Sequence, residues 1–301
     1  MTVSGGLVVL SPHLDDAVLS VGGLIAGQVR SGRCVEVWTA FTAGPADPAT
    51  VPRRLRPFAD YRARIAEDDA ALDLLGCGRR RLGLPERIWR TPPAGGLRAA
   101  FRTPEGPDGF ARLAELTETA VEALSRPGAE LLGPLGVGNH VDHVEVALAV
   151  LAAADRLGAW DRVGFYEDFY ALGEAARHRH PVTVRHPWPR AAAPGWAAPV
   201  EGLVLRATPL IARGPSLDGY LPGLTGWPWR CAGHPLDGDL EGLKLAAVAA
   251  YRSQTPALGG IRRLSAILRR AHRMRGGELL WRVGSAGSAG SVRSAERAGA
   301  D

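Results

Sequence analysis

The sequence contains no hydrophobic run long enough to cross a membrane. No apolar stretch approaches the ~20 residues that a membrane-spanning helix needs, and charged residues make up 22% of the 301 positions. The N-terminus also lacks the basic segment and cleavage site of a secretory signal peptide, and its apolar run Leu7–Leu10 is too short for a signal core. We therefore expect a cytoplasmic protein that makes no membrane contact.

Cysteine is scarce as well. The chain has three cysteines, Cys34, Cys77 and Cys231, and no two of them form a Cys-x-x-Cys motif. An odd number of widely separated cysteines is typical of reduced cytosolic proteins. Any zinc site in this chain is therefore not expected to be built from thiolates.

Lysine is almost absent. Lys244 is the only lysine, so 35 of the 36 basic side chains are arginines, and the formal net charge is +5. The planar guanidinium group favours anionic partners, which is compatible with an acidic substrate. No nucleic-acid-binding motif accompanies this charge, and no Gly-x-Gly-x-x-Gly follows the first expected strand, so neither nucleic-acid nor dinucleotide binding is predicted.

Two polar clusters stand where an expected strand gives way to a helix. The run Leu7–Leu10 leads into Ser-Pro-His-Leu-Asp-Asp at residues 11–16, and Ala129–Leu135 precedes Asn-His-Val-Asp-His at residues 139–143. Taken singly, each cluster has an ordinary explanation, because an acidic side chain often caps a helix and a loop histidine is often solvated. In a parallel sheet, however, both turns lie at the carboxyl ends of strands, where such folds bind ligands. The pair therefore predicts one shared site.

The residue types in these clusters suit metal-assisted hydrolysis of an amide. Catalytic zinc takes three ligands from histidine and carboxylate side chains and keeps a fourth position for water. His13, Asp16 and His143 form such a set, which leaves Asp15 and His140 as an acid/base pair. Zinc lowers the pKa of water from ~16 toward ~7. A carboxylate can then accept the proton, and a histidine can stabilise the oxyanion or protonate the leaving amine.

Pro-His-Leu-Asp-Asp followed by Asn-His-Val-Asp-His resembles the motifs of the PIG-L/LmbE-like N-deacetylases, although that family usually has proline where this chain has Leu14. The likeness covers residues 5–170 well and residues 240–285 weakly. It extends to four further places in the family's order: Arg64 with Glu67 and Asp68, Pro134–Gly138, Tyr166–Asp168, and Lys244 with Tyr251–Gln254.

The resemblance implies a zinc-dependent enzyme of bacterial secondary metabolism that removes the N-acetyl group from an amino sugar or a glycoconjugate. One Zn²⁺ per chain, or another divalent metal, would be held by the three ligands proposed above. Asp15 would be the general base, His140 would stabilise or protonate, and Asp142 would orient one imidazole. The expected substrate-binding residues are Arg64, Arg53 and Gln254.

Several interpretations stay open at this point. Arg64 either binds sugar hydroxyls or an anion, or pairs with Glu67 or Asp68 on its own helix. A His-x-His pair, His178 and His180, is a reserve candidate for metal binding. The alternative functions are an amidase acting on a larger acyl or thiol-conjugate amide, and a non-catalytic membrane-associated protein of the same fold. Only the basic helix expected at residues 261–274 favours the last of these.

Strand and helix patterns alternate along the chain and predict an α/β fold with a Rossmann-like, mostly parallel sheet flanked by helices. The expected strands are Leu7–Ser11, Cys34–Phe41, Arg81–Leu84, Glu130–Gly133 and Arg162–Tyr166. The expected helices are Asp16–Arg30, Phe58–Leu75, Gly109–Ser125, Val141–Leu157, Leu240–Tyr251 and Ile261–Met274. Two long connections rich in proline, Thr42–Pro57 and Pro85–Asp108, are expected to form the rim of the substrate site.

Composition divides the chain into four parts. Residues 1–174 are expected to form the Rossmann-like catalytic core. Residues 175–240, rich in proline and tryptophan, are expected to be an irregular cap or a small segment with one strand at Val200–Leu205. Residues 241–283 are expected to be C-terminal helices that pack on the core, and residues 284–301 a disordered tail rich in glycine, serine and alanine.

Overall fold

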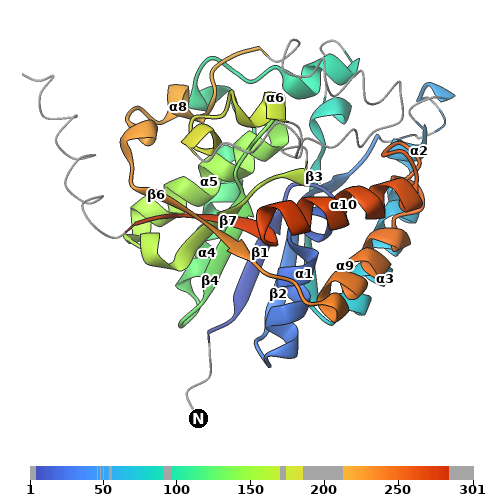
Figure 1. The fold of residues 1–301 in the computed structure, drawn as a ribbon. Coiled ribbons are helices and arrows are strands. Elements are labelled where there is room, and N and C mark those ends of the chain that lie inside the picture. Colours follow the sequence, from blue (N-terminus) through green and yellow to red (C-terminus); the bar gives the residue numbers. More distant parts are fainter. Residues whose placement is uncertain are drawn as a thin grey trace, which may run out of the picture.

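The computed structural model describes residues 5–90 except 46, 48, 50, 54 and 55, and residues 96–169, 174–185 and 213–284. Its centre is a seven-stranded sheet with the order β3-β2-β1-β4-β5-β7-β6 (Figure 1). The strands are β1 Leu7–Ser11, β2 Val35–Ala43, β3 Gly78–Pro85, β4 Glu130–Pro134, β5 Val163–Tyr166, β6 Trp229–His234 and β7 Glu278–Val283. β1 to β5 run parallel to one another. β7 pairs antiparallel with β5, and β6 pairs antiparallel with β7. The predicted α/β fold with a mostly parallel sheet is confirmed.

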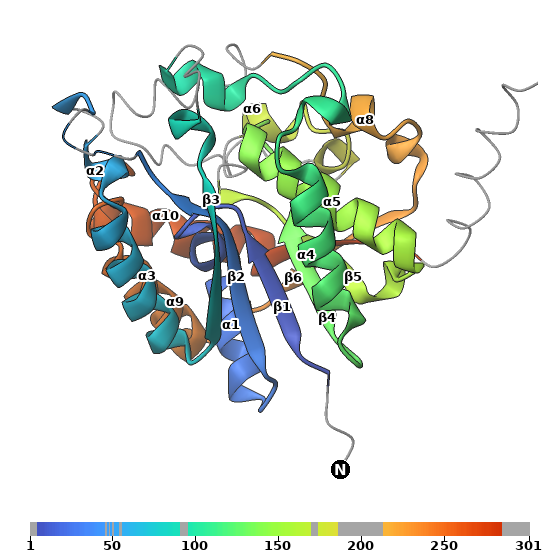
Figure 2. The same ribbon diagram turned by 180° about the vertical axis from the view of Figure 1, so that it is seen from behind.

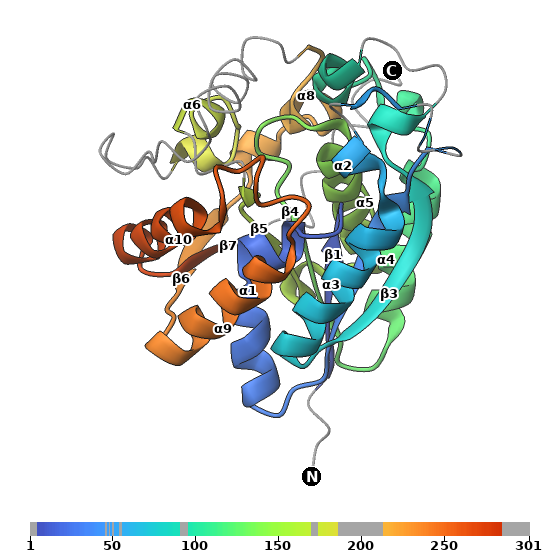
Figure 3. The ribbon, with the colours of Figure 1, turned by 90° about the vertical axis from the view of Figure 1, so that its right-hand side faces the viewer.

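Helices cover both faces of this sheet. On one face, α4 (Leu113–Ser125) packs against α5 (Val141–Leu157), as Figure 2 shows. On the other face, α9 (Gly238–Ala250) packs against both α1 (Asp16–Arg30) and α3 (Tyr61–Leu75) (Figure 3). Within the described residues, the other α-helices are α2 Arg56–Ala59, α6 Glu174–Arg177, α8 Leu217–Tyr220 and α10 Ile261–Arg275.

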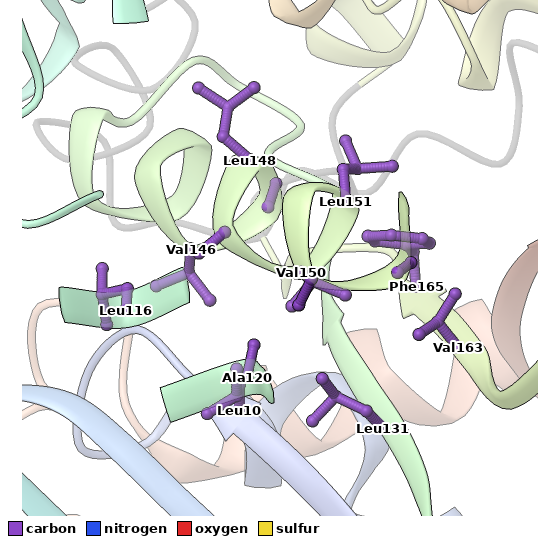
Figure 4. Packing of buried hydrophobic residues seen from close by; sticks show 14 of the residues in the cluster. Leu10, Leu116, Ala120, Leu131, Val146, Leu148, Val150, Leu151, Val163 and Phe165 are labelled. Carbon is purple, nitrogen blue, oxygen red and sulfur yellow. The ribbon is translucent and has the colours of Figure 1, made fainter. Parts of the chain in front are cut away.

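The two faces of the sheet have separate hydrophobic cores, because side chains alternate along a strand. Leu7 and Val9 of β1 belong to the core under α1, α3 and α9. Val8 and Leu10 point the other way, into the core under α4 and α5. Figure 4 shows Leu10 in this second core with Val146 and other side chains of α5. Burial on both faces explains why the strands read as continuous apolar runs rather than as alternating ones.

Helix α10 packs on the domain through one apolar stripe. Leu264, Ile267 and Leu268 are buried, whereas Arg262, Arg263, Arg269, Arg270 and Arg273 are exposed. Arg275, the last residue of the helix, is half-buried beside Glu167. This is the arrangement that an amphipathic helix adopts at the surface of a globular protein. In the described part of the chain, no helix is both long enough and apolar enough to span a membrane.

Some elements differ from the expectation. β6 and β7 are not predicted, although both lie in the sheet, and α4 begins at Leu113 because the residues expected to form its first turn are in a 3₁₀ helix and turns. The expected strand Val200–Leu205 lies outside the described residues, as does the tail from residue 285. The four-part division of the chain stays a prediction. Within it, β6 falls in the part expected to be a cap and β7 in the part expected to be helical.

Candidate active site

The two polar clusters lie at the carboxyl ends of neighbouring strands. β1 and β4 pair directly and in parallel, so the loop after β1 and the loop after β4 leave the sheet side by side. β2, which follows β1 in the chain, lies on one side of this pair, and β5, which follows β4, lies on the other side. The winding of the sheet therefore reverses direction between β1 and β4. Open α/β sheets bind their ligands at such a switch point. The fold therefore brings together the two motifs that the sequence separates by more than a hundred residues.

The turn after β1 is held by hydrogen bonds of Ser11, the last residue of that strand. The Ser11 hydroxyl donates to the backbone oxygen of His13 at 2.7 Å and accepts from the backbone N–H of Ala17 at 3.1 Å. Asp15 has φ 132° and ψ −30°, outside the regions that residues with a side chain normally adopt. Its carboxylate makes no capping hydrogen bond to α1. The turn thus holds Asp15 in a strained conformation of the kind that gathers at functional sites.

Three donor atoms from the two loops form a compact triangle. His13 Nδ1 lies 3.0 Å from Asp16 Oδ2, His143 Nε2 lies 3.2 Å from the same oxygen, and the two nitrogens are 3.3 Å apart. Ligands bound at 2.0–2.1 Å to a tetrahedral zinc ion stand about 3.3 Å from one another. All three side chains are buried. The triangle therefore has the dimensions of three corners of a zinc coordination shell.

Two carboxylates behind the triangle orient its imidazoles. His13 Nε2 donates to Asp142 Oδ2 at 3.0 Å, and His143 Nδ1 donates to Asp168 Oδ1. In the neutral ring, each bond places the proton on the nitrogen that faces away from the triangle, so the nitrogen inside the triangle is the one that can bind a cation. Asp142 occupies the position predicted for it. Asp168 is missed by the sequence analysis as a site residue, although its position directly after β5, at the same sheet edge, would have indicated it.

Asp142 is itself held by the segment after β3. Its Oδ1 accepts from Arg90 Nη2 at 2.7 Å, and its Oδ2 accepts from the backbone N–H of Arg87 at 2.9 Å. Burial would raise the pKa of Asp142, but the hydrogen bond from His13 and the charge of Arg90 lower it well below its usual value. Arg90 also contacts Glu145 at 3.2 Å. Arg90 is a second residue that sequence reasoning missed, because nothing in its irregular segment indicates that it reaches the site.

His140 lies beside the triangle with its own hydrogen bond. Its ring centre is 5.0 Å from those of both His13 and His143, and the three rings could offer a wider site of three histidine nitrogens. However, His140 Nδ1 accepts from the backbone N–H of Asp142 at 3.3 Å, which places the ring proton on Nε2. Burial, reinforced by the two neighbouring imidazoles, lowers the pKa of His140 and keeps the ring neutral. His140 is thus better suited to donate a hydrogen bond than to bind a metal.

Asp15 and Arg64 meet at the edge of the site. Burial, reinforced by the charge of Asp16, raises the pKa of Asp15, and the charge of Arg64 opposes this shift. Arg64 Nη1 donates to Glu86 Oε1 at 2.6 Å and to the backbone oxygen of Phe58 at 3.2 Å. The partner of Arg64 is therefore Glu86, and the alternative pairing with Glu67 or Asp68 on its own helix is wrong. The role of Arg64 in substrate binding stays a prediction.

The other expected substrate residues are less central. Arg53 is exposed in the segment that follows β2. Gln254 is buried, and its Nε2 donates to Ser253 Oγ at 2.9 Å, which in turn donates to Glu67 Oε2 at 2.7 Å. Gln254 thus belongs to a contact between the end of α9 and α3. Substrate binding by Arg53 and Gln254 stays a prediction.

The reserve pair of histidines has another explanation. His180 is buried; its Nε2 donates to the backbone oxygen of Leu135 at 3.0 Å, and its Nδ1 accepts from the backbone N–H of Val182 at 3.3 Å. Burial lowers its pKa to about 3, so the ring is neutral. His178, two residues earlier, is exposed. Because both nitrogens of His180 have backbone partners, the pair is not suited to hold a metal.

Comparisons with known proteins find a matching family profile and a related deacetylase. Residues 8–154 match the family profile of the PIG-L family, GlcNAc-PI de-N-acetylase. The chain is 33% identical over 176 residues to 2'-N-acetylparomamine deacetylase of Streptomyces fradiae; the match covers 56% of this chain and 59% of that relative, so it spans less than two thirds of the relative's length.

Solved structures show the same fold. The zinc-inhibited form of teicoplanin deacetylase is 23% identical, with a TM-score of 0.63 over 92% of this chain and 97% of that one. A pseudoaglycone deacetylase is 22% identical, with a TM-score of 0.61 over 95% of this chain and 99% of that one. The family profile spans both loop motifs, which meet at one sheet edge, and over residues 8–154 the chain is therefore similar to the PIG-L family.

Proposed function

We propose that the chain is a zinc-dependent N-deacetylase that hydrolyses the N-acetyl amide of an amino sugar or a glycoconjugate. The triangle of His13, Asp16 and His143 carries the proposal, because its edges of 3.0, 3.2 and 3.3 Å match the spacing of zinc ligands. The family profile that matches residues 8–154, and the deacetylase named among the relatives of the chain, support the same chemistry.

The donor set suits zinc or a similar divalent ion. Two imidazoles and one carboxylate are a usual ligand set of catalytic zinc, and Asp142 and Asp168 fix both imidazoles in the ligating tautomer. When bound here, zinc would lower the pKa of water toward about 7 and polarise the amide carbonyl. The carboxylates around the triangle favour a cation at its centre, which is a further reason to place the metal there.

The side chains beside the triangle would carry the proton transfers. The Asp15 carboxylate accepts the proton of the attacking water while the water oxygen bonds to the carbonyl carbon. His140, neutral and protonated on Nε2, donates a hydrogen bond to the oxyanion that this addition creates. When the C–N bond breaks, the proton held by Asp15 passes to the nitrogen, which leaves as a free amine. Acetate is the second product.

The test measures metal and turnover separately. Asp15→Asn is expected to keep its zinc, by elemental analysis, and to lose at least about 100-fold in acetate release, the usual contribution of one general base. Asp155→Asn, at the exposed far end of α5, is the matched control and is expected to retain full activity.

The assay uses two sets of substrates. The first is N-acetylglucosamine glycosides, and the second is the same glycosides with a longer acyl group in place of the acetyl group. Release of acetate by the wild type, at a higher kcat/KM than the longer acid, supports the proposal. Preference for the longer chain would replace it with a general amidase. Absence of any carboxylic acid product from the zinc-loaded protein would overturn it.

A further inference from the structure

The segment that follows β3 reaches the candidate metal site through Arg90. The side chain of Arg90 is 13% exposed, and each of its three nitrogens has a partner. Nε donates to the backbone oxygen of Pro85 at 3.0 Å, Nη1 to Glu145 Oε2 at 3.2 Å and Nη2 to Asp142 Oδ1 at 2.7 Å. Its Cζ also lies 4.6 Å from the centre of the Phe41 ring. The mechanism proposed above does not use this residue.

These contacts tie three elements together. Pro85 ends β3, Phe41 lies in β2, and Asp142 and Glu145 stand about one turn apart on α5. Figure 2 shows the chain leaving β3 at the same end of the sheet at which α5 begins. A guanidinium group can reach two carboxylates and a carbonyl at once, since its donors form a fixed, planar fork. The orientation of Asp142 thus depends on a side chain that is anchored outside α5.

Asp142 passes this constraint on to His13. It is completely buried, and its Oδ2 accepts from His13 Nε2 at 3.0 Å and from the backbone N–H of Arg87 at 2.9 Å. With Oδ1 held by Arg90, the carboxylate cannot rotate without losing a charge-assisted hydrogen bond. The Phe41 ring lies on another side of His13, with the two ring centres 6.0 Å apart. Arg90 therefore contacts two of the groups that lie beside the His13 ring.

We propose that Arg90 is a positioning residue of the metal site. It holds Asp142, and through Asp142 it fixes the His13 ring so that Nδ1 points into the triangle of metal ligands. The inference rests on the proposed zinc-dependent function. It adds a residue that lies outside both sequence motifs and on which the affinity for zinc depends.

The charge of Arg90 alone would have the opposite effect on zinc. A guanidinium repels a divalent cation, so its removal would strengthen zinc binding if Arg90 acted only through its charge. Loss of its hydrogen bonds would weaken zinc binding, because the partners of a ligating histidine typically account for 10- to 100-fold in metal affinity. The direction of the change therefore separates the two effects.

The experiment measures the Kd for zinc by competition with a chelator of known affinity. Arg90→Met removes both the charge and the fork, and is expected to raise the Kd at least about tenfold. Arg90→Lys keeps the charge but replaces the fork with an ammonium group, and is expected to raise the Kd as well.

Arg33→Met is the matched control. The side chain of Arg33 is 15% exposed, and its three nitrogens likewise donate to a backbone oxygen, a side-chain oxygen and a carboxylate, those of Gly5, Gln28 and Glu130. These partners lie at the opposite end of the sheet, where β1 and β4 begin. The control is expected to leave the Kd for zinc unchanged.

A double-mutant cycle tests the route through Asp142. If Arg90 acts through this carboxylate, Arg90→Met should raise the Kd less than about threefold in the background of Asp142→Asn. Equal effects in the two backgrounds would overturn the route. The visible spectrum of the cobalt(II)-loaded protein depends on the coordination geometry, and it is expected to change in Arg90→Met and not in Arg33→Met.

Thermal unfolding of the same variants separates positioning from stability. A lower Tm in Arg90→Met with an unchanged Kd for zinc would make Arg90 a structural residue only and overturn the inference, as would tighter zinc binding. If Arg90→Met does not fold, the Kd of Arg90→Lys decides in the same way.

The inference and the function on which it rests can fail separately. Acetate release by the wild type, together with an unchanged Kd in both Arg90 variants, would overturn the positioning role and leave the deacetylase intact. Weaker zinc binding in the variants, without acetate release by the wild type from any substrate, would support the positioning role and overturn the deacetylase. Absence of zinc binding by the wild type would overturn both.

Discussion

Substitution of Asp168 by asparagine tests whether the metal site depends on the tautomer of His143. In the structure, Asp168 Oδ1 accepts from His143 Nδ1, and its Oδ2 accepts from the backbone N–H of Val137 at 2.8 Å. A carboxylate can accept both bonds, whereas an amide has one oxygen and one NH₂ group. If the amide oxygen faces His143, its NH₂ opposes the Val137 N–H. If the NH₂ faces His143, the imidazole proton must move to Nε2, the nitrogen that belongs to the donor triangle.

Either orientation of the amide costs one interaction that supports metal binding. Loss of a carboxylate that orients a metal-bound histidine typically weakens metal binding 10- to 100-fold, which corresponds to about 1.4–2.7 kcal/mol. We therefore expect the Kd for zinc of Asp168→Asn to rise by about that factor. Competition with a chelator of known affinity measures it, with Asp155→Asn as the control.

The two orientations also predict different accompanying effects in this variant. A forced tautomer would make zinc binding weaker at every pH, since the wrong nitrogen holds the proton whenever the ring is neutral. Loss of the bond to Val137 would keep the tautomer but loosen the side chain that orients the ring, so it would weaken zinc binding and also reduce the thermal stability. An unchanged zinc Kd in Asp168→Asn would refute the tautomer argument and would favour a site in which His143 is not a ligand.

Four further predictions concern other parts of the chain. His143→Ala is expected to remove stoichiometric zinc as measured by elemental analysis, and full retention of zinc would contradict the ligand set. Arg64→Lys, which keeps the charge near Asp15 but loses the geometry of the Glu86 contact, is expected to lower kcat/KM by up to about 100-fold at normal zinc content. Lys244→Met is expected to destabilise the fold by about 3–5 kcal/mol in urea unfolding, because Glu278 would remain buried without its cation. Burial and the charge of Lys244 lower the pKa of His272 to about 4, below its unfolded value of ~6.5. The stability that neutral His272 contributes is complete above pH ~6.5, and up to about 3 kcal/mol of it is lost as the pH falls toward 4. The variant His272→Gln should lack this part of the pH dependence of the free energy of unfolding.

The sequence predicts the part of the fold that repeats a simple pattern. β1, α1, β4 and α5 are apolar runs with clear ends, and the two polar motifs occur between them, so both the parallel core and the five residues at its switch point could be named in advance. β7 gives a weaker signal, because its six residues follow Gly276 and Gly277 directly after a basic helix. β6 contains a glycine and has no alternating pattern. These two strands are held by long-range pairing, β7 with β5 and β6 with β7, and a local sequence pattern does not contain that information.

The residues that contact the proposed metal ligands show the same limit of sequence-based prediction. Asp142 could be predicted because it lies within the His-Val-Asp-His motif. Arg90 could not, because its contact with Asp142 depends on the path of an irregular segment after β3. For Arg64, helical spacing suggests an ion pair with Glu67 or Asp68. In the structure its guanidinium pairs with Glu86 instead. Spacing along a helix predicts neighbours on its surface, and Arg64 is buried.

The position of Lys244, the single lysine of the chain, has a structural explanation. Helix α1 is broken at Val21, which has φ −134° and ψ 24°. Glu278 accepts from the backbone N–H groups of Gly23 and Leu24 at 3.0 and 2.7 Å, and Lys244 Nζ lies 2.6 Å from Glu278 and 3.4 Å from the backbone oxygen of Ser20. An ammonium group is compact and can place its donors in several directions, whereas a guanidinium is planar and larger. The chain uses arginine at 35 of its 36 basic positions. Its one lysine lies where a small buried cation is needed, at the break in the helix whose N-terminal end carries Asp15 and Asp16.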